Sequence, residues 1–488
     1  MSAKASPAEI RAKLSHPVID GDGHWVEYTP VFAERMRKVV GDLGADGFIK
    51  SQERIPSALQ INRAERTARG VAMEGFWGRQ SVNTLDRATA MMPKMFYDRL
   101  DELGIDFGIV YPTAGLGIPR IADDATRRAV IRGFNIVTHD YFKAFSDRLT
   151  PAAVIPVYTP EEAIEELEFV TKQLGSKVCM FGSGVRRPVE KAKGLDPDIA
   201  KYVQNFDQLG IDSQHDYDPL WQKCRELGIA PTFHTGGRGY GERMSPSNFT
   251  FNHIGHFAAA GHNVAKALFL GGVTRRFPDL RFAFLEGGVG WGCQLFCDLI
   301  EHWERRGAKG LENMDPTKLD RKMLRELVDK YGYGDLAAEL DKRDGWPLEE
   351  DFLTGGEPPD DYIHCKITQK QDWHDLYATP YYFGCEADDA MNSVAFGKAM
   401  PLGARINAIY SSDIGHFDVK DMRDPLRQAW ELVEDGHITG ADFKDFTFSN
   451  AVRLWGTQNP RFFEGTPVAK EAAAVLKATA APVRAAAE

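Results

Sequence analysis

Eight short apolar runs recur along this chain, and segments with helical periodicity separate them. Strands that alternate with helices in this way are typical of a parallel sheet, because each helix carries the chain back across the sheet. Eight such units predict an α/β fold, a (β/α)8 barrel of the TIM type. The 488 residues are enough for one barrel with insertions. The runs are residues 18–19, 107–111, 152–157, 177–181, 229–233, 281–285, 381–383 and 406–410.

The spacing of these runs predicts the domain organisation. Residues 16–465 are expected to form a single barrel domain, with a polar N-terminal arm, 1–15, and an Ala-rich C-terminal tail, 466–488. Two connections are too long for simple loops, at about 27–101 after the first strand and about 304–380 after the sixth. Long excursions at the carboxyl end of a barrel commonly build lids or substrate pockets, so we expect lids here rather than further domains.

The composition argues against nucleic acid and membranes as partners. The chain has 59 basic and 70 acidic residues, a net charge of -11, and no dense basic cluster. No apolar stretch approaches the ~20 residues that span a bilayer, and Met1–Leu14 is polar without a signal-peptide core. The six cysteines are scattered, which argues against a disulfide framework. We therefore expect a cytoplasmic protein that acts on a small molecule.

Four of the eight runs end on residues that bind metal ions in proteins. Asp22 and His24 end the first run, and because they are two positions apart they face the same side of a regular strand. His234, Glu286 and Asp413 end the fifth, sixth and eighth runs. The carboxyl ends of the strands meet at one end of a barrel, where strand eight lies beside strand one. Three carboxylates and two imidazoles suit Zn²⁺, Fe²⁺ or Mn²⁺, as one ion or two.

Each of these residues also has a purely structural interpretation. His234 could be a hydrogen-bonded core histidine, Glu286 could pair with a buried arginine, and Asp413 could cap a helix. Residues 20–23 resemble the start of a calcium-binding loop, but residues 25–27 do not continue that pattern. The combination of four strand ends is therefore more specific than any one of its members.

Three further histidines lie in predicted helices. His256, together with the weaker candidate His253, opens a helix after strand five and could be a ligand or an acid–base group. His302 lies about four helical turns beyond Glu286, where it could bind the metal or simply pack. The sequence leaves the roles of all three histidines open.

Three more candidates lie directly after strands. His416 follows Asp413 by three residues and could hold a ligand or the substrate. Arg186 and Arg187 follow strand four and could clamp a substrate carboxylate, although arginines in loops are usually solvated.

Several of these segments together resemble the amidohydrolase superfamily. They are the run Ile19–His24, the strand-end His234, the stretch 277–288 that contains Glu286, and the stretch 412–416. The chain is most similar to the branch named after aminocarboxymuconate semialdehyde decarboxylase, over roughly residues 16–465. The resemblance implies a (β/α)8 barrel, a divalent metal and often a homodimer. It also implies that Asp22, His24, His234 and Asp413 are metal ligands.

Two departures from that branch shape the functional prediction. Asp22 stands where the branch commonly has His or Glu, and Glu286 stands where the decarboxylases have a catalytic histidine. A carboxylate can bind a metal or act as a base, but it cannot replace an imidazole as an electrophile. The departure at Glu286 therefore argues against decarboxylation.

The leading prediction is a metal-dependent hydrolase in which an activated water attacks a C–N, C–O or C–C acyl centre. Asp413 would be ligand and base, Glu286 would hold the metal or assist, and His256 or His416 would protonate the leaving group. The alternatives are a mono- or dinuclear non-heme iron oxygenase, a metal-dependent decarboxylase, and an inactive partner subunit without metal.

Overall fold

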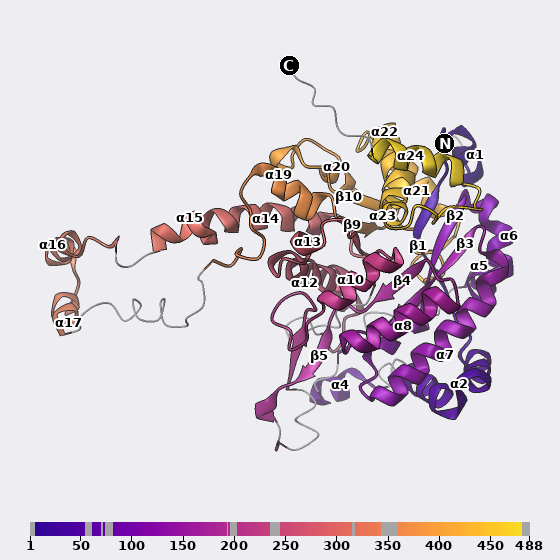
Figure 1. The fold of residues 1–488 in the computed structure, drawn as a ribbon, viewed down its shortest axis with the longest axis horizontal. Helices are drawn as coiled ribbons and strands as arrows, with labels where there is room; N and C mark the ends of the chain where they lie inside the picture. The colour runs from indigo at the N-terminus through magenta and orange to yellow at the C-terminus, as the bar shows by residue number, and fades with distance from the viewer. Residues whose placement is uncertain are drawn as a thin grey trace.

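The eight predicted strands form one parallel sheet that curls into a barrel (Figure 1). The computed structural model describes residues 5–53, 61–69, 72–73, 82–192, 194–195, 203–234, 245–314, 318–342 and 360–480. Neighbouring strands follow the order β1-β2-β3-β4-β7-β8-β9-β10, so the predicted (β/α)8 barrel is confirmed. These strands are β1 (Ile19–Trp25), β2 (Phe107–Pro112), β3 (Leu149–Ile155), β4 (Val178–Phe181), β7 (Pro231–Phe233), β8 (Phe282–Phe284), β9 (Tyr381–Cys385) and β10 (Asn407–Tyr410).

The ring closes between the last strand and the first. The backbone N–H of Asp413 donates to the carbonyl of Asp22 over 3.1 Å. The N–H of His24 donates to the carbonyl of Ile414 over 2.7 Å. Predicted metal-binding residues from the two ends of the domain therefore become neighbours at this seam.

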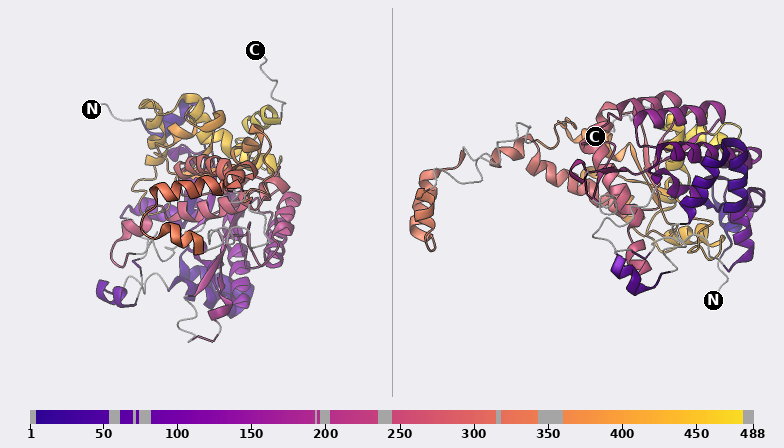
Figure 2. Two further views of the ribbon diagram at one scale, coloured as in Figure 1. Left: turned by 90° about the vertical axis from the view of Figure 1, so that its left-hand side faces the viewer. Right: turned by 90° about the horizontal axis from the view of Figure 1, so that it is seen from below.

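Helices cover the outside of the barrel (Figures 1 and 2). Their ends follow local signals: the Thr159 hydroxyl accepts the N–H of Glu162 at the start of α8 (Pro160–Gln173), and α10 (Asp218–Leu227) ends at Gly228 with φ 67°. The other helices between and after the strands are α7 (Asp124–Phe142), α11 (Phe249–His253), α12 (His256–Leu270), α13 (Val273–Arg276), α14 (Gly290–Arg306), α19 (Lys370–Trp373), α20 (Asn392–Ala395), α21 (Asp424–Glu434), α22 (Gly440–Lys444) and α23 (Asn450–Gln458).

A short hairpin between β4 and β7 lies outside the barrel sheet and was not predicted. Its strands, β5 (Val185–Pro188) and β6 (Gln204–Asp207), are antiparallel. The Arg187 guanidinium donates to Asp207 Oδ2 and to the Tyr217 hydroxyl, each over 2.9 Å. The Tyr217 hydroxyl in turn donates to the carbonyl of Val157 over 2.6 Å, which ties the hairpin to the barrel.

Most of the first insertion forms an outer layer rather than a lid. Its long helix α2 (Thr29–Gln52) lies against α7, and the rings of Phe32 and Phe134 are 4.8 Å apart there. Two of its described parts reach the segment after β7: Arg66 of α4 (Arg63–Arg69) donates to the carbonyl of Pro246 over 2.6 Å, and the N–H of Met73 donates to the carbonyl of Ser245 over 2.8 Å. Residues 54–60, 70–71 and 74–81 of the predicted lid lie outside the described residues. The insertion ends with α5 (Thr84–Met91) and α6 (Pro93–Leu103).

The second insertion leaves the barrel. α15 (Ala308–Leu311), α16 (Arg321–Tyr331) and α17 (Leu336–Lys342) continue outward from the end of α14 (Figures 1 and 2). The lid prediction is wrong for these helices, because they lie apart from the barrel end that they were expected to cover. Residues 315–317 and 343–359 of this insertion lie outside the described residues.

Both predicted terminal segments contain a helix. In the N-terminal arm, Ser6 and Glu9 form a capping box at the start of α1 (Pro7–Lys13). In the C-terminal tail, α24 (Ala469–Ala480) packs on α23. Residues 1–4 and 481–488 lie outside the described residues. Nowhere in the described part of the chain is a helix long and apolar enough to cross a membrane.

A buried histidine at the amino-terminal end of the barrel should make folding stability depend on pH. His16 is 5% exposed, its Nε2 lies 3.1 Å from Thr447 Oγ1, and burial lowers its pKa from about 6.5 to about 4. The unfolded chain takes up this proton near pH 6.5 but the native chain only near pH 4. Stability present above pH 6.5 is thus lost as the pH falls toward 4, by roughly 2 kcal/mol after allowance for solvent screening.

We expect His16→Gln to flatten the pH dependence of the free energy of unfolding in this window. Urea unfolding at several pH values between 7.5 and 4.5 (about the range of the titration) measures it. The matched control is His437→Gln, which replaces an exposed histidine and should follow the unaltered protein. Equal slopes for His16→Gln and the unaltered protein would contradict the prediction.

Candidate metal centre

Six ionisable side chains meet at the carboxyl end of the barrel. All are buried, and Glu286, whose side chain is 6% exposed, is the most accessible of them. They come from β1 and from the segments that follow β7, β8 and β10. They form two overlapping groups that could hold an ion, namely Asp22, His24, His234 and Glu286, and His24, Glu286, Asp413 and His416.

The candidate ligand atoms have the spacing that a shared ion requires. His24 Nε2 lies 3.0 Å from His234 Nε2 and 3.4 Å from Asp22 Oδ1. It also lies 3.6 Å from Asp413 Oδ1. His234 Nε2 lies 3.2 Å from Asp22 Oδ1 and 3.4 Å from Glu286 Oε2. Atoms bound ~2.1 Å from one ion are about 3.0 Å apart at right angles and about 3.4 Å apart at tetrahedral angles.

Three carboxylate oxygens of this cluster lack a normal hydrogen bond within the described residues. They are Asp22 Oδ1, Glu286 Oε2 and Asp413 Oδ1. A buried charge without a partner is costly, and a divalent cation between these atoms would compensate all three. Imidazole nitrogen with carboxylate oxygen is a donor set that suits Zn²⁺, Fe²⁺ or Mn²⁺. The residues present therefore fit a divalent metal.

The imidazoles of the cluster are in the form that binds metal. Burial lowers the pKa of His24 to about 3, and His416 acts in the same direction. Burial also lowers the pKa of His416 to about 4. Both rings are therefore neutral at pH 7, which is the form of imidazole that binds a cation.

The carboxyls differ in their tendency to ionise. Burial, and after it the charges of Asp413 and Asp22, raises the pKa of Glu286 well above its usual range. Burial and then Asp418 raise the pKa of Asp413 in the same way. At Asp22 burial also favours the neutral form, but His234 and other hydrogen-bond partners outweigh it and lower the pKa. Asp22 is thus the most acidic of the three carboxyls, whereas a bound cation would favour the ionised form of Glu286 and Asp413 against the effect of burial.

Two residues of the cluster lie on strained backbone. Glu286 has φ 56° and Asp413 has φ 49°, both in the left-handed region. Such a conformation costs about 1–3 kcal/mol at residues other than glycine and is common at functional sites. Gly415 follows with φ 105°, and a Cβ there would lie 2.5 Å from the carbonyl oxygen of His24. Glycine therefore allows the loop after β10 to lie directly on β1.

Asp20 holds this loop in position and was not singled out from the sequence. Its Oδ2 accepts the Ser412 hydroxyl over 2.5 Å, and its Oδ1 accepts the Ser412 N–H over 3.0 Å. Burial raises the pKa of Asp20 to about 7 despite these donors. Because Ser412 precedes Asp413, Asp20 is a positioning residue for the metal-binding carboxylate.

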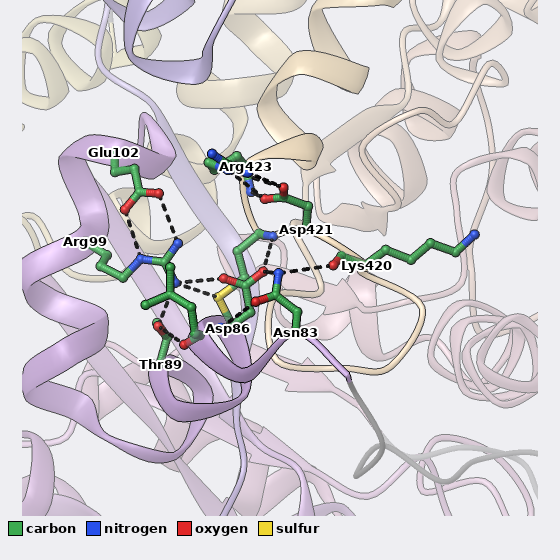
Figure 3. A network of polar contacts seen from close by, with 10 residues as sticks. Asn83, Asp86, Thr89, Arg99, Glu102, Lys420, Asp421 and Arg423 are labelled. Carbon is green, nitrogen blue, oxygen red and sulfur yellow. Dashed lines mark hydrogen bonds and ion pairs between the residues drawn. The ribbon is translucent and has the colours of Figure 1, made fainter.

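The far end of the same loop is anchored to the first insertion (Figure 3). Asp86 of α5 accepts the N–H of Met422 over 2.9 Å and an N–H of Arg99 over 2.8 Å. Asn83 Nδ2 donates to the carbonyl of Lys420 over 3.4 Å. The insertion thus fixes the loop that carries Asp413 and His416.

A comparison with known protein families identifies the family of this chain. The sequence model of the amidohydrolase family matches residues 19–333, well over half of the chain. The chain belongs to the amidohydrolase family. None of the curated proteins compared with this amidohydrolase matches its sequence.

Solved structures similar to this amidohydrolase include three from bacteria. An amidohydrolase from Mycobacterium avium subsp. paratuberculosis K-10 is 18% identical, with 76% of this chain and 75% of that chain covered and a TM-score of 0.46. The 5-carboxyvanillate decarboxylase of Novosphingobium aromaticivorans, complexed with manganese, is 13% identical over 91% and 97%, with a TM-score of 0.48. The dihydroxybenzoic acid decarboxylase of Polaromonas sp. JS666, also with manganese, is 12% identical over 92% and 99%, with a TM-score of 0.45.

His302 lies outside the cluster of this amidohydrolase. It is exposed on α14, and its Nδ1 lies 2.7 Å from the carbonyl of Asp298 in the same helix. His302 belongs to neither of the two groups that could hold an ion among the described residues, so its role as a metal ligand stays a prediction without support from the geometry.

The two predicted substrate-clamping arginines lie on β5. The Arg187 guanidinium is bonded to Asp207 and Tyr217 and so ties the hairpin together, and its role as a substrate clamp stays a prediction. Arg186 is exposed on the same strand and points to the opposite face. Neither belongs to the metal-binding groups.

The two histidines after β7 lie near the cluster. His256 begins α12, is 9% exposed, and packs edge-on against Phe257 at 5.0 Å. Phe257 in turn contacts the ring of His234 at 5.2 Å. His253 stacks on Phe249 at 5.0 Å, and burial lowers its pKa. Phe257 thus contacts both His256 and His234, and His256 remains a candidate acid.

Two residues near the cluster escaped the sequence analysis. Glu386 directly follows β9, and part of it reaches the solvent. The surrounding protein nevertheless disfavours its charged form: burial, and after it the charges of Asp413 and Asp418, raises the pKa of Glu386 well above the usual range. The sequence did contain an indication of Glu386, because it follows an apolar run in the same way as the candidate metal-binding residues follow theirs. Thr113 follows β2, and its hydroxyl lies 3.2 Å from His416 Nε2, a contact that no local pattern indicates.

Proposed function

We propose that this amidohydrolase is a metal-dependent hydrolase that attacks a C–N, C–O or C–C acyl centre of a small organic molecule. The observation that carries the proposal is the set of donor atoms at the barrel end: one carboxylate oxygen each of Asp22, Glu286 and Asp413 lies 3.2–3.9 Å from Nε2 of His24 or His234, and these two nitrogens are 3.0 Å apart. One or two Zn²⁺, Fe²⁺ or Mn²⁺ ions suit these atoms. When bound, such an ion lowers the pKa of a water ligand toward neutrality.

Asp413 is the base in this proposal. A general base works best when its pKa lies near the working pH, and burial moves the pKa of Asp413 upward from the usual carboxyl range. Its Oδ1 lies 2.5 Å from His416 Nδ1, so a proton taken from water can pass to the imidazole. The Thr113 hydroxyl, 3.2 Å from the other ring nitrogen, fixes the orientation of His416. His416 or His256 then protonates the leaving group.

The charge of the barrel mouth supports hydrolysis over decarboxylation. Asp22, Glu286 and Asp413 carry three carboxylates, and Glu386 and Asp418 act electrostatically on them from the mouth. One divalent cation offsets only two of these charges. A substrate that must present its own carboxylate, as a decarboxylase requires, would enter against this field. A neutral or cationic acyl compound would not.

A second candidate is an iron oxygenase. The observation that favours it is the overlap of the two ligand groups, which share His24 and Glu286 and could hold two ions side by side. Two adjacent ions in a carboxylate-rich site suit dinuclear iron chemistry as well as hydrolysis. Metal identity and the need for dioxygen separate this candidate from the hydrolase.

The test combines metal analysis with anaerobic assays. Purified protein should contain divalent metal in about stoichiometric amount, and under argon it should hydrolyse members of a panel of uncharged esters, amides, lactones and 1,3-diketones. Dialysis against a chelator should abolish turnover, and the same metal should restore it. His302→Ala serves as the control variant and should behave like the unaltered protein.

Three results would contradict the proposal. Protein without metal and without turnover would indicate an inactive subunit. Bound iron with turnover only in the presence of dioxygen would indicate the oxygenase. Release of carbon dioxide from aromatic carboxylic acids, without hydrolysis of the panel, would indicate a decarboxylase.

A further inference from the structure

A tyrosine near the end of β2 contacts two imidazoles of the metal centre, although β2 supplies no candidate ligand. Tyr111 lies directly opposite His24 of β1 in the register of the two strands. Paired residues of neighbouring strands point to the same side of a sheet, so the Tyr111 side chain points into the barrel as His24 does. Its ring centre lies 6.3 Å from that of His24 and 5.2 Å from that of His234. Tyr111 thus lies beside two candidate ligands at once.

The hydroxyl of Tyr111 reaches across the barrel interior. It donates to Thr232 Oγ1 of β7 over 2.9 Å, and the Thr232 hydroxyl donates to the carbonyl of Cys179 on β4 over 2.9 Å. β2 and β7 are not neighbours in the sheet, because β3 and β4 lie between them. Thr232 and His234 are two positions apart and therefore face the same side of their strand. The hydrogen bond consequently fixes the Tyr111 ring below His234, toward the amino-terminal end of the barrel.

The two imidazoles lack the support that metal-binding histidines usually have. Such a histidine commonly donates its second ring N–H to an oxygen atom, which fixes the orientation of the ring. Among the described residues, no atom forms a hydrogen bond with Nδ1 of His24 or of His234. Packing orients the rings instead. His416 stacks on His24 at 3.9 Å, Phe257 contacts His234 at 5.2 Å, and Tyr111 contacts both of them.

We propose that Tyr111 is a positioning residue for the metal centre. Its ring, held by the hydrogen bond to Thr232, keeps Nε2 of His24 and Nε2 of His234 at their spacing of 3.0 Å, which one shared ion requires. Without this ring each imidazole can rotate about its side-chain bonds, and the two lone pairs no longer converge on one point. The loss therefore falls on metal affinity and coordination geometry. The proposal rests on the metal site of the proposed function, but its test needs no substrate.

Titration with Co²⁺ tests the proposal on the full-length protein after dialysis against a chelator. The visible absorption of Co²⁺ reports the number and the geometry of its ligands. Tyr111→Phe keeps the ring but removes the hydroxyl that holds it, and should raise the dissociation constant of Co²⁺ about 10-fold. Tyr111→Leu removes the ring as well and should raise the dissociation constant about 100-fold. In both variants the absorption bands of bound Co²⁺ should change in position or intensity.

Tyr381 provides the matched control. It is fully buried like Tyr111, and its hydroxyl donates to the carbonyl of Ala265 over 2.9 Å. It is the first residue of β9, however, and so lies at the end of the barrel away from the metal centre. Tyr381→Phe and Tyr381→Leu remove the same atoms from the core as the changes at Tyr111, and should lower the urea midpoint to a similar extent. They should leave the Co²⁺ spectrum and dissociation constant unchanged.

Thr232→Val tests the hydrogen bond from its other end. Valine has nearly the shape of threonine but cannot accept the hydrogen bond, so this variant should reproduce the effects of Tyr111→Phe. Because both changes break the same contact, the double variant should bind Co²⁺ no more weakly than either single variant.

Three results would overturn the proposal. If the Tyr111 variants lose stability like those of Tyr381 but keep the Co²⁺ spectrum and dissociation constant, Tyr111 only fills the core. If Tyr111→Leu does not fold, the comparison of Tyr111→Phe with Tyr381→Phe decides alone. Additive losses in the double variant would show that the bond to Thr232 does not hold the ring. Unaltered protein that binds no Co²⁺ would instead contradict the metal site itself, and with it the proposed function.

Discussion

Replacement of His234 by alanine should abolish metal binding and activity together. His234 Nε2 lies within 3.4 Å of three other candidate ligand atoms, those of His24, Asp22 and Glu286. Loss of a residue that merely supports a ligand weakens metal affinity about 10–100-fold, and loss of a ligand itself should exceed that range. We expect less than a tenth of the metal content of the unaltered protein, and a fall in turnover of about 10³-fold or more. Elemental analysis and titration with Zn²⁺ and Mn²⁺ measure the first effect.

Two controls separate metal loss from unfolding. His302→Ala removes a histidine from the exposed side of α14 and should keep full metal content. His234→Gln fills the buried space left by the imidazole, and both His234 variants should retain the circular dichroism of the unaltered protein. Full metal content in His234→Ala would show that the cluster does not bind metal through this residue.

The barrel was predictable because its strands are short apolar runs between helices. The run 229–233 contains β7, and the run 107–111 falls within β2. β1 was predicted as 18–19 only, although it spans Ile19–Trp25, because its aspartates and glycines have low strand propensity. Its register also shifts against β2 between Asp20 and Gly23, and no local pattern indicates such a bulge.

The elements that the sequence did not predict are those that tertiary contacts decide. β5 and β6 hold polar residues such as Arg187 and Asp207 that satisfy each other, and such pairs give no strand periodicity. The helical character of the second insertion could be predicted, but not its direction, because the sequence does not encode where a helix points relative to a barrel.

The candidate metal site was largely predictable for a topological reason. Asp22 lies in β1, and His234, Glu286 and Asp413 each follow an apolar strand. A barrel brings the carboxyl ends of its strands together. His302 was included because of its distance along the helix, which gives no information about the direction of its side chain, and it lies outside both groups. The role of Asp20 was missed because it depends on Ser412, 392 positions later in the chain.

Replacement of Asp413 by asparagine should separate metal binding from catalysis. Asparagine has the same shape as aspartate and tolerates the left-handed backbone at this position, where φ is 49°, so the loop should keep its conformation. Asp22, His24, His234 and Glu286 remain as one complete ligand group, and metal content should therefore stay near that of the unaltered protein.

The same change removes the proposed base. An amide oxygen cannot take the proton of the attacking water, and a positioned general base contributes about 10²–10⁴-fold to the rate. We expect kcat to fall by about that factor while KM changes little, because the substrate contacts remain. Steady-state kinetics on metal-quantified protein measures both, with Asp435→Asn, at an exposed position after α21, as the matched control. An unchanged kcat would show that another group is the base. The next candidate is Glu286, because its pKa is also raised well above the usual range.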